Sequence, residues 1–148
     1  MFKYDSEEKI LEFVRSFESA EISRDEWGHV EHVVVAAHYC SSFDHEEALA
    51  RMKTGILNLL EQGFGIGPSE ESPYHETLTV FWMGAVRHCL ELGSGEPIPA
   101  AFRRVAENLP KNLPFRYYSR ARLFSKEARN GFVAPENPLP WSAAGGHS

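Results

Sequence analysis

The sequence predicts an all-α fold, a single-domain bundle of about five to six helices followed by an irregular, proline-rich C-terminal tail. Apolar residues recur at helical spacing in most segments of the first 109 residues. Several of these segments open with Ser or Asp followed three positions later by Glu, a helix-start signature. No segment alternates between apolar and polar residues with a period of two, so no sheet is expected.

The first two helices are predicted from their opening residues and their apolar spacing. Asp5 is the expected cap of the first helix, which runs to about Ala20. Ser23 and Glu26 form a capping box that places the start of the second helix just before a pair of histidines. This second helix continues to about Cys40, and its high apolar content indicates a central position in the bundle.

The third helix is expected to begin at Asp44, to continue to about Leu60 and to stop near Gly63. Gly55 lies in the middle of this helix, where glycine costs roughly 1 kcal/mol relative to alanine. We therefore expect another helix to approach closely at Gly55. The glycine-rich segment 63–73 is predicted to be a loop that can cover a site.

The fourth helix is predicted to begin at Ser72-Pro73, because Ser is a common cap and Pro a common first residue. It runs from Tyr74 to about Leu92 and stops at Gly93. A shorter fifth helix is expected over Ile98–Leu109.

The C-terminal part is predicted to contain two short helical turns, Ser119–Phe124 and Ser125–Asn130, followed by an irregular tail beyond Gly131. The helical domain is expected to cover residues 1–141. Residues 142–148 are small and polar and are predicted to be a disordered tail.

Composition and charge narrow the classes of function. The formal net charge of −6 argues against nucleic acid as a partner. Residues 1–100 contain 7 Lys and Arg against 18 Asp and Glu, whereas residues 101–148 contain 8 against 3. The favoured interpretation is that the basic C-terminal segment docks against the acidic body. The alternative is that four arginines of this segment hold an anionic ligand: Arg116, Arg120, Arg122 and Arg129.

The remaining global features favour a cytoplasmic protein with no membrane partner. No apolar run approaches the roughly 20 residues that span a bilayer, and the N-terminus lacks the layout of a signal peptide. Cys40 and Cys89 lie in apolar helical patterns and do not form a Cys-x-x-Cys pair. We expect both to be free thiols that pack as small hydrophobic side chains.

Two histidines at the start of the second helix are the first candidate site. His29 and His32 are three residues apart, which places both imidazoles on one helix face. Such a pair can hold one metal ion, or can combine a base with an orienting group. Glu26 precedes them at the same spacing, but the capping box already accounts for its role.

A second polar cluster, Tyr74 to Thr79, opens the fourth helix. His75 and Thr79 are expected to share a helix face, and a helix N-terminus favours the neutral form of His75. Together with His29 and His32, His75 would complete a three-histidine site for one divalent metal ion with one open position. A metal-free alternative uses His75 as general base, with Tyr74 or Thr79 orienting a substrate.

Three sequence motifs resemble those of a family of small, uncharacterised bacterial all-helical proteins. The motifs are Trp-x-His-x-x-His, Tyr-His-Glu-Thr-Leu-Thr and a C-terminal Arg-Tyr-Tyr-Ser block, in the stretches Trp27–Ala36, Tyr74–Trp82 and Arg116–Pro135. The resemblance implies no particular reaction. It places six residues in motif positions: His29, His32, Tyr74, His75, Glu76 and Thr79. It also marks Tyr118, Ser119 and Arg129 as a third group of site residues. These three residues and Glu76 would bind a ligand.

These observations support two hypotheses of function. The first is a histidine-lined pocket between the second and fourth helices, in a divalent-metal-dependent enzyme or a small-molecule binder. The alternative is a non-catalytic interaction or regulatory module, expected to be a homodimer, in which the histidines hydrogen-bond backbone groups and fix helix packing. The sequence leaves open whether the protein is an enzyme and which substrate it takes.

Overall fold

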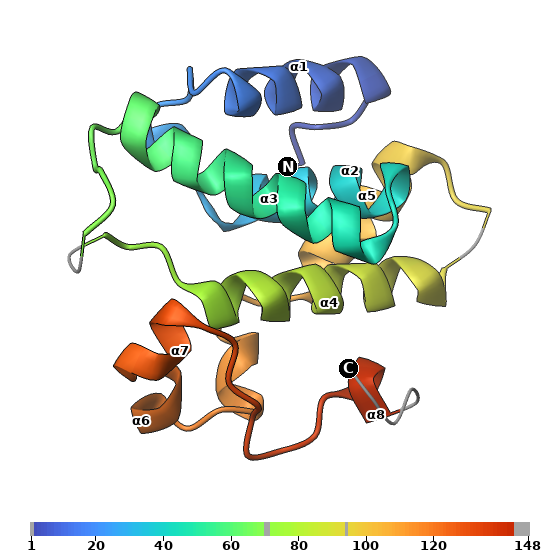
Figure 1. Cartoon of the computed structure of the whole chain (residues 1–148). Coiled ribbons are helices and arrows are strands. Elements are labelled where there is room, and N and C mark those ends of the chain that lie inside the picture. Colours follow the sequence, from blue (N-terminus) through green and yellow to red (C-terminus); the bar gives the residue numbers. More distant parts are fainter. Residues whose placement is uncertain (1, 70–71, 94, 144–148) are drawn as a thin grey trace.

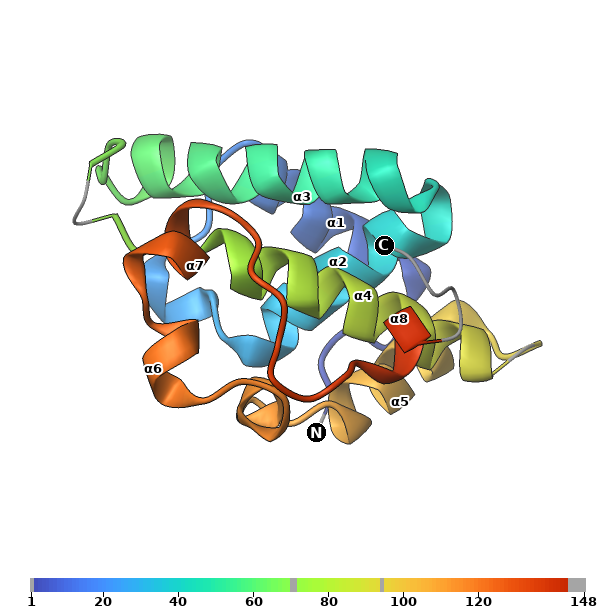
Figure 2. The ribbon, with the colours of Figure 1, turned by 60° about the horizontal axis from the view of Figure 1, so that its bottom comes forward.

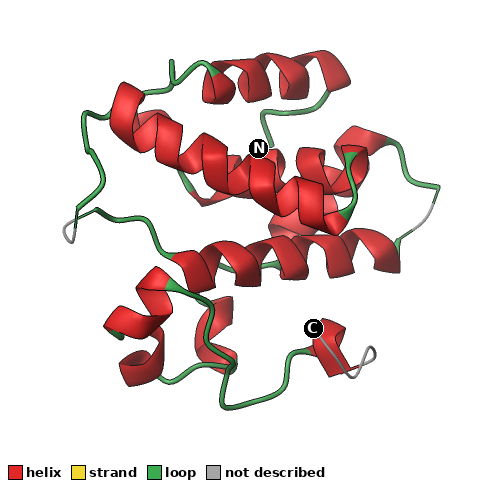
Figure 3. Ribbon diagram, in the orientation of Figure 1, coloured by secondary structure: helices red, strands yellow, loops and turns green. Residues whose placement is uncertain are grey.

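The fold is all-α, as predicted. A computed structural model of the chain describes residues 2–69, 72–93 and 95–143, and these residues form helices and loops with no strand (Figure 3). Within this part of the chain no helix is both long and apolar enough to cross a membrane. Five helices have 11 to 17 residues: α1 (Glu7–Glu18), α2 (His29–Ser42), α3 (His45–Asn58), α4 (Glu76–Leu92) and α5 (Ile98–Asn108).

Six shorter helical segments connect or follow these helices. They are η1 (Arg24–Glu26), η2 (Leu59–Gly63), η3 (Leu113–Arg116), α6 (Arg120–Leu123), α7 (Lys126–Asn130) and α8 (Pro140–Ala143). Figure 1 shows α4 in the middle of the molecule, with α2, α3 and α5 on one side and α1 beyond them. Residues 113–143, which we name the C-terminal layer, cover the other side of α4, and the rotated view in Figure 2 shows the same arrangement.

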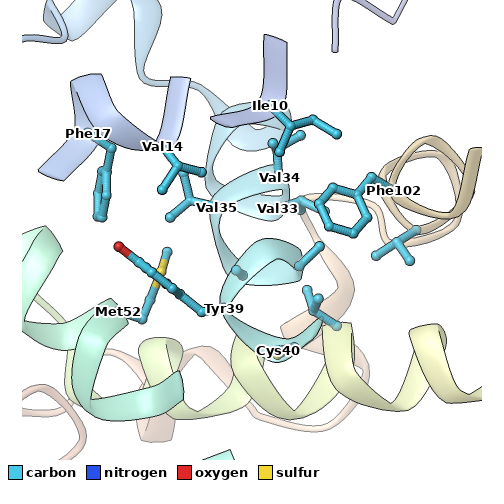
Figure 4. Packing of buried hydrophobic residues seen from close by; sticks show 14 of the residues in the cluster. Ile10, Val14, Phe17, Val33, Val34, Val35, Tyr39, Cys40, Met52 and Phe102 are labelled. Atoms are coloured by element: carbon cyan, nitrogen blue, oxygen red, sulfur yellow. The ribbon is translucent and has the colours of Figure 1, made fainter. Parts of the chain in front are cut away.

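The main core is centred on α2. Residues Val33–Ala37 are fully covered, which explains why this helix has no polar face in its middle turns. Each fully buried aliphatic or aromatic side chain contributes roughly 1.5–3 kcal/mol to folding. Figure 4 shows side chains from three other helices converging on α2: Ile10, Val14 and Phe17 from α1, Met52 from α3 and Phe102 from α5.

Helix α4 is buried on two faces. One face supplies Met83 and Val86 to the main core. The other supplies Phe81, Trp82 and Ala85 to a second cluster, which it forms with residues of the C-terminal layer. Those partners are Leu113, Tyr118, Leu123 and Leu139. The two predicted free thiols, Cys40 and Cys89, are both unpaired and buried, as expected.

The predicted start of the second helix is only partly correct. The capping box of Ser23 and Glu26 forms, but it caps the three-residue segment η1. Helix α2 begins separately at His29, after Gly28. The carboxylate of Glu31 accepts a hydrogen bond of 3.2 Å from the Gly28 N–H, which is one half of a capping box, since glycine has no side chain to supply the other half.

The predicted start of the fourth helix at Ser72-Pro73 is wrong. Helix α4 begins at Glu76, and the residue that caps it is His75. The Nδ1 atom of His75 accepts a hydrogen bond of 3.1 Å from the Leu78 N–H. Histidine is not among the usual capping residues, so the sequence favoured the serine three positions earlier.

The predicted cap Asp5 of the first helix is also wrong, because Ser6 caps α1 and its side chain accepts from the Lys9 N–H. The predicted cap Asp44 of α3 forms. The two short turns begin where expected, after Ser119 and Ser125, whose side chains cap α6 and α7.

The tail is held on α4 by a buried hydroxyl and an aromatic anchor. The Thr77 hydroxyl donates to the Gly131 carbonyl at 2.9 Å and accepts from the Val133 N–H at 3.1 Å. Trp141, in the short helix α8, packs against the second hydrophobic cluster. Residues 144–148 of the expected disordered tail lie outside the described residues.

The close approach expected at Gly55 is confirmed. A Cβ atom added to Gly55 would lie 2.3 Å from a ring carbon of Phe17 in α1. Gly84 in α4 has the same role on the other side of the molecule, where a Cβ atom would lie 2.3 Å from the indole nitrogen of Trp141. Glycine therefore costs helix propensity at both positions and allows a large aromatic ring to pack directly on the backbone.

We expect Gly55→Ala to lower the free energy of unfolding by about 1–3 kcal/mol, because the added methyl group must displace the buried ring of Phe17. Urea unfolding measures the effect. Gly67→Ala is the matched control, since a Cβ atom there meets nothing within 4 Å. An unchanged or raised stability of Gly55→Ala would contradict the close packing of α1 on α3.

Candidate functional site

A cavity of about 580 Å³, which we name the main cavity, lies where the start of α2, the end of α3, the start of α4 and the C-terminal layer meet. Most of its wall is apolar or aromatic: Trp27, Ile56, Leu60, Phe64, Ile66, Pro73, Leu78, Trp82, Pro114, Phe115, Leu123 and Phe124. Its polar side chains are Arg24, His29, His32, Tyr74, His75, Thr79 and Lys111. The three histidines singled out in the sequence thus line one cavity.

His29 ties the start of α2 to the end of α5. Its Nε2 atom lies 2.7 Å from the Leu109 carbonyl oxygen, and since a carbonyl only accepts, Nε2–H is the donor. Its ring meets Trp82 edge-on, with 5.0 Å between ring centroids. The imidazole is therefore a bridge between two helices and is held by contacts on both of its sides.

Both nitrogens of His75 are used inside the protein. Nδ1 accepts from the Leu78 N–H in its capping role, and Nε2 donates to the Leu123 carbonyl at 2.7 Å. This pair of bonds fixes the neutral tautomer with the proton on Nε2. Burial lowers the pKa of His75, which keeps the neutral form dominant. His75 connects the start of α4 to α6 and has no lone pair directed at the cavity.

His32 differs from the other two histidines. Within the described residues its imidazole makes no hydrogen bond, although it lines the main cavity and is largely covered. The ring meets Trp27 and Trp82 edge-on, with centroid distances of 5.7 and 6.5 Å. Burial and the nearby His29 lower the pKa of His32 to about 4. At neutral pH it therefore offers a bound molecule one N–H donor and one nitrogen acceptor.

The expected three-histidine metal site is not formed. Among the described residues, no group of three or more His, Cys, Asp or Glu side chains has an arrangement that could hold a metal ion. The physical reason is that both nitrogens of His75 are engaged inside the protein, Nδ1 by the Leu78 N–H and Nε2 by the Leu123 carbonyl. His29 and His32 together leave two imidazoles with an unengaged nitrogen, where a structural or catalytic zinc ion needs three or four ligands.

The metal-free arrangement of a base and an orienting group is also absent in this geometry. A general base needs a free lone pair, and that of His75 is occupied by the Leu78 N–H. Tyr74 donates to Glu76 Oε1 at 2.7 Å, and burial raises its pKa. The Thr79 hydroxyl donates to the carbonyl oxygen of His75 at 3.0 Å, within the first turn of α4.

The residues expected as a third contributor lie elsewhere. Tyr118 donates to the Val133 carbonyl at 2.6 Å, and burial raises its pKa to about 12. Ser119 caps α6 and bonds the carboxylate of Glu136. Both hold the C-terminal layer together. Arg129 donates to the Ser72 carbonyl and lines a neighbouring cavity of about 410 Å³, which shares wall residues with the main cavity.

Several wall residues were not predicted as site residues. Trp27 and Trp82 are among them, although each stands beside one of the two histidine motifs. Phe64 and Ile66 come from the loop that was expected to cover a site. They follow η2, a turn of π-helix, and such turns are rare and frequent at functional sites. No local sequence pattern distinguished the contributions of Phe115 and Phe124 from the C-terminal layer.

Comparisons of the chain with models of known protein families, with curated proteins and with solved structures find no significant match.

Replacements at His75 separate its two hydrogen bonds. We expect His75→Ala to lower the free energy of unfolding by about 2 kcal/mol, because both the helix cap and the bond to Leu123 are lost. His75→Asn keeps a capping side chain and should cost about half as much. Urea unfolding of both variants measures the difference. Equal losses would show that the cap contributes nothing.

The pKa of His32 predicts a loss of stability in mild acid. The unfolded chain binds a proton at the ordinary pKa of 6.5, whereas the folded protein does so only near 4. The unfolded state therefore holds more protons between these values, so stability is complete above pH 6.5 and falls as the pH is lowered toward 4. For this one group we expect a loss of about 2 kcal/mol between roughly pH 7 and pH 5.

His32→Gln tests this assignment because glutamine is polar but does not titrate. Between pH 7 and pH 5, the free energy of unfolding of this variant should fall by about 2 kcal/mol less than that of the original protein. Urea titrations of the two proteins at both pH values give the comparison. Identical acid losses would show that His32 is not buried in its neutral form.

Proposed function

We propose that the protein binds a small, mostly apolar organic molecule in the main cavity. The cavity volume of about 580 Å³ falls within the range of roughly 300–1,000 Å³ that is usual for small-molecule sites. An apolar wall with a few polar groups is also the usual composition of such sites. Its aromatic members supply flat surfaces, and burying apolar area against them is the main source of affinity.

The observation that carries this proposal is the imidazole of His32. Within the described residues no group supplies a hydrogen-bond partner to this imidazole, which faces the main cavity. A ligand oxygen or nitrogen in the cavity would supply the missing bond. Trp27 and Trp82 contact the ring from two sides and hold its orientation, so His32 is positioned to select a ligand by one polar group.

The geometry favours binding over metal-dependent catalysis. His29 and His75 serve as tethers of the cavity wall, because each donates its Nε2 proton to a carbonyl in a neighbouring segment. This use of the two histidines agrees with the structural role that the second hypothesis from the sequence gave them. The imidazole of His32 then remains for recognition of a ligand in the aromatic cavity.

An interaction module is the second candidate function. The observation that favours it is a set of exposed phenylalanines in the C-terminal layer: Phe115, Phe124 and Phe132, which are 37%, 54% and 46% exposed. Phe115 and Phe124 also line the main cavity, so both functions draw on the same residues. A ligand titration separates them, since only the binding function requires saturable occupation of the cavity.

N-phenylnaphthylamine (NPN), a neutral dye that fluoresces in apolar sites, is a suitable probe of the cavity. We expect one molecule to bind per chain. Ile66→Trp should weaken binding at least about tenfold, because Ile66 lines the cavity and lies outside the helices, so a larger ring fills the space with little effect on folding. A fluorescence titration measures the dissociation constant of each protein.

Leu92→Trp is the matched control. Leu92 is 72% exposed at the last residue of α4, about 24 Å along the helix axis from its start beside the cavity. This variant adds the same side chain and should bind NPN like the original protein. Equal binding by both variants would place the dye outside the main cavity and remove the support for the proposed function.

A further inference from the structure

We infer that the ligand of the main cavity is an organic anion, an apolar body with one acidic group that Arg24 and Lys111 bind at the cavity wall. This inference rests on the proposed binding function and adds the charge of the ligand. It follows from the distribution of charged side chains around the cavity.

The wall of the main cavity contains no acidic side chain among the described residues. The chain as a whole has 21 Asp and Glu against 15 Lys and Arg, so acidic residues are the more common charge. Arg24 and Lys111 are the only charged side chains among the described residues that line this wall. A bound cation would find no counter-charge here, whereas an anion would find two.

Neither of these basic groups has a carboxylate partner within the described part of the chain. Arg24 lies over the ring of Phe64, with its Cζ atom 5.4 Å from the ring centroid, and donates to the Phe64 carbonyl at 3.3 Å. These contacts fix one side of the guanidinium and leave other N–H donors for a ligand. Lys111 is exposed and lies between α5 and η3.

Two acidic residues that are close in sequence to the wall, Glu31 and Glu76, are already engaged. Glu31 accepts from the Tyr4 hydroxyl at 2.8 Å, and Lys3 Nζ lies 3.8 Å away. Glu76 pairs with Lys53 at 3.1 Å and accepts from Tyr74. These carboxylates are therefore compensated by lysines and hydrogen bonds, which reduces their repulsion of an anion in the cavity.

His32 suits the same ligand. As a neutral imidazole it can donate one N–H to an oxygen of the acidic group, and it adds no charge that the buried site would have to compensate. A hydrogen bond to a charged acceptor is stronger than one to a neutral acceptor. Two cationic groups and one neutral donor, set in an aromatic wall, match the chemistry of an amphipathic organic acid.

Two dyes that differ by one acidic group test the inference. Anilinonaphthalene sulfonate (ANS) has the ring system of NPN plus a sulfonate, and the readout is the ratio of the NPN dissociation constant to that of ANS. In the double variant Arg24→Gln and Lys111→Gln this ratio should fall on the order of tenfold. Arg103→Gln removes one exposed charge from α5, away from the cavity wall, and should leave the ratio unchanged.

A carboxylate provides an independent arm. Naphthylacetate should displace ANS from the original protein at a lower concentration than its neutral counterpart naphthylacetamide, and this preference should vanish in the double variant. Thermal unfolding of each variant verifies that the fold is retained, which the exposure of Arg24 and Lys111 leads us to expect.

The outcomes separate this inference from the proposed function. One outcome is saturable NPN binding that is lost in Ile66→Trp, with an unchanged dye ratio in the double variant. This outcome overturns the inference that the ligand is an anion, and it keeps the cavity as a binding site. An equal fall of the ratio in Arg103→Gln also overturns it, because net charge alone would then explain the effect. Failure of both dyes to bind overturns both proposals.

Discussion

The burial of α4 on two faces is the constraint on which the rest of the structure depends. One face completes the core centred on α2, and the other requires a second apolar surface, which the C-terminal layer supplies. A helix that is apolar nearly all round cannot lie at the surface without exposing part of itself to water. The chain beyond Leu113 is too irregular to form a core of its own, so it folds against α4 through Leu113, Leu123 and Leu139.

The main cavity is a consequence of this layered arrangement. The C-terminal layer does not close fully over the N-terminal end of α4, and the space between them is lined by aromatic side chains from both. Two imidazoles connect the segments that form its walls. His29 joins α2 to the end of α5, and His75 joins α4 to α6. Directional bonds of this kind fix a separation that apolar packing alone would let collapse.

The three histidines have acquired different roles through their surroundings. His75 caps a helix and bonds a carbonyl, so both of its nitrogens are satisfied, and His29 bonds a carbonyl through Nε2. His32 is one turn farther along α2 than His29, points at the same cavity and makes no hydrogen bond within the described structure. Burial disfavours its charged form, and a largely covered neutral imidazole without a partner is better suited to contacting a ligand than to maintaining the fold.

The sequence alone determined the all-α class, the approximate extent of the five long helices, the cap at Asp44 and the close contact at Gly55, because these depend on local spacing and on one residue's backbone or side chain. It also singled out His29, His32 and His75, which line one cavity. Only the tertiary structure decided what each histidine does, since their partners Leu109 and Leu123 lie 80 and 48 residues away in the chain. Sequence spacing shows which side chains share a helix face but not which of their nitrogens are already engaged, so it could not show that both nitrogens of His75 are used inside the protein.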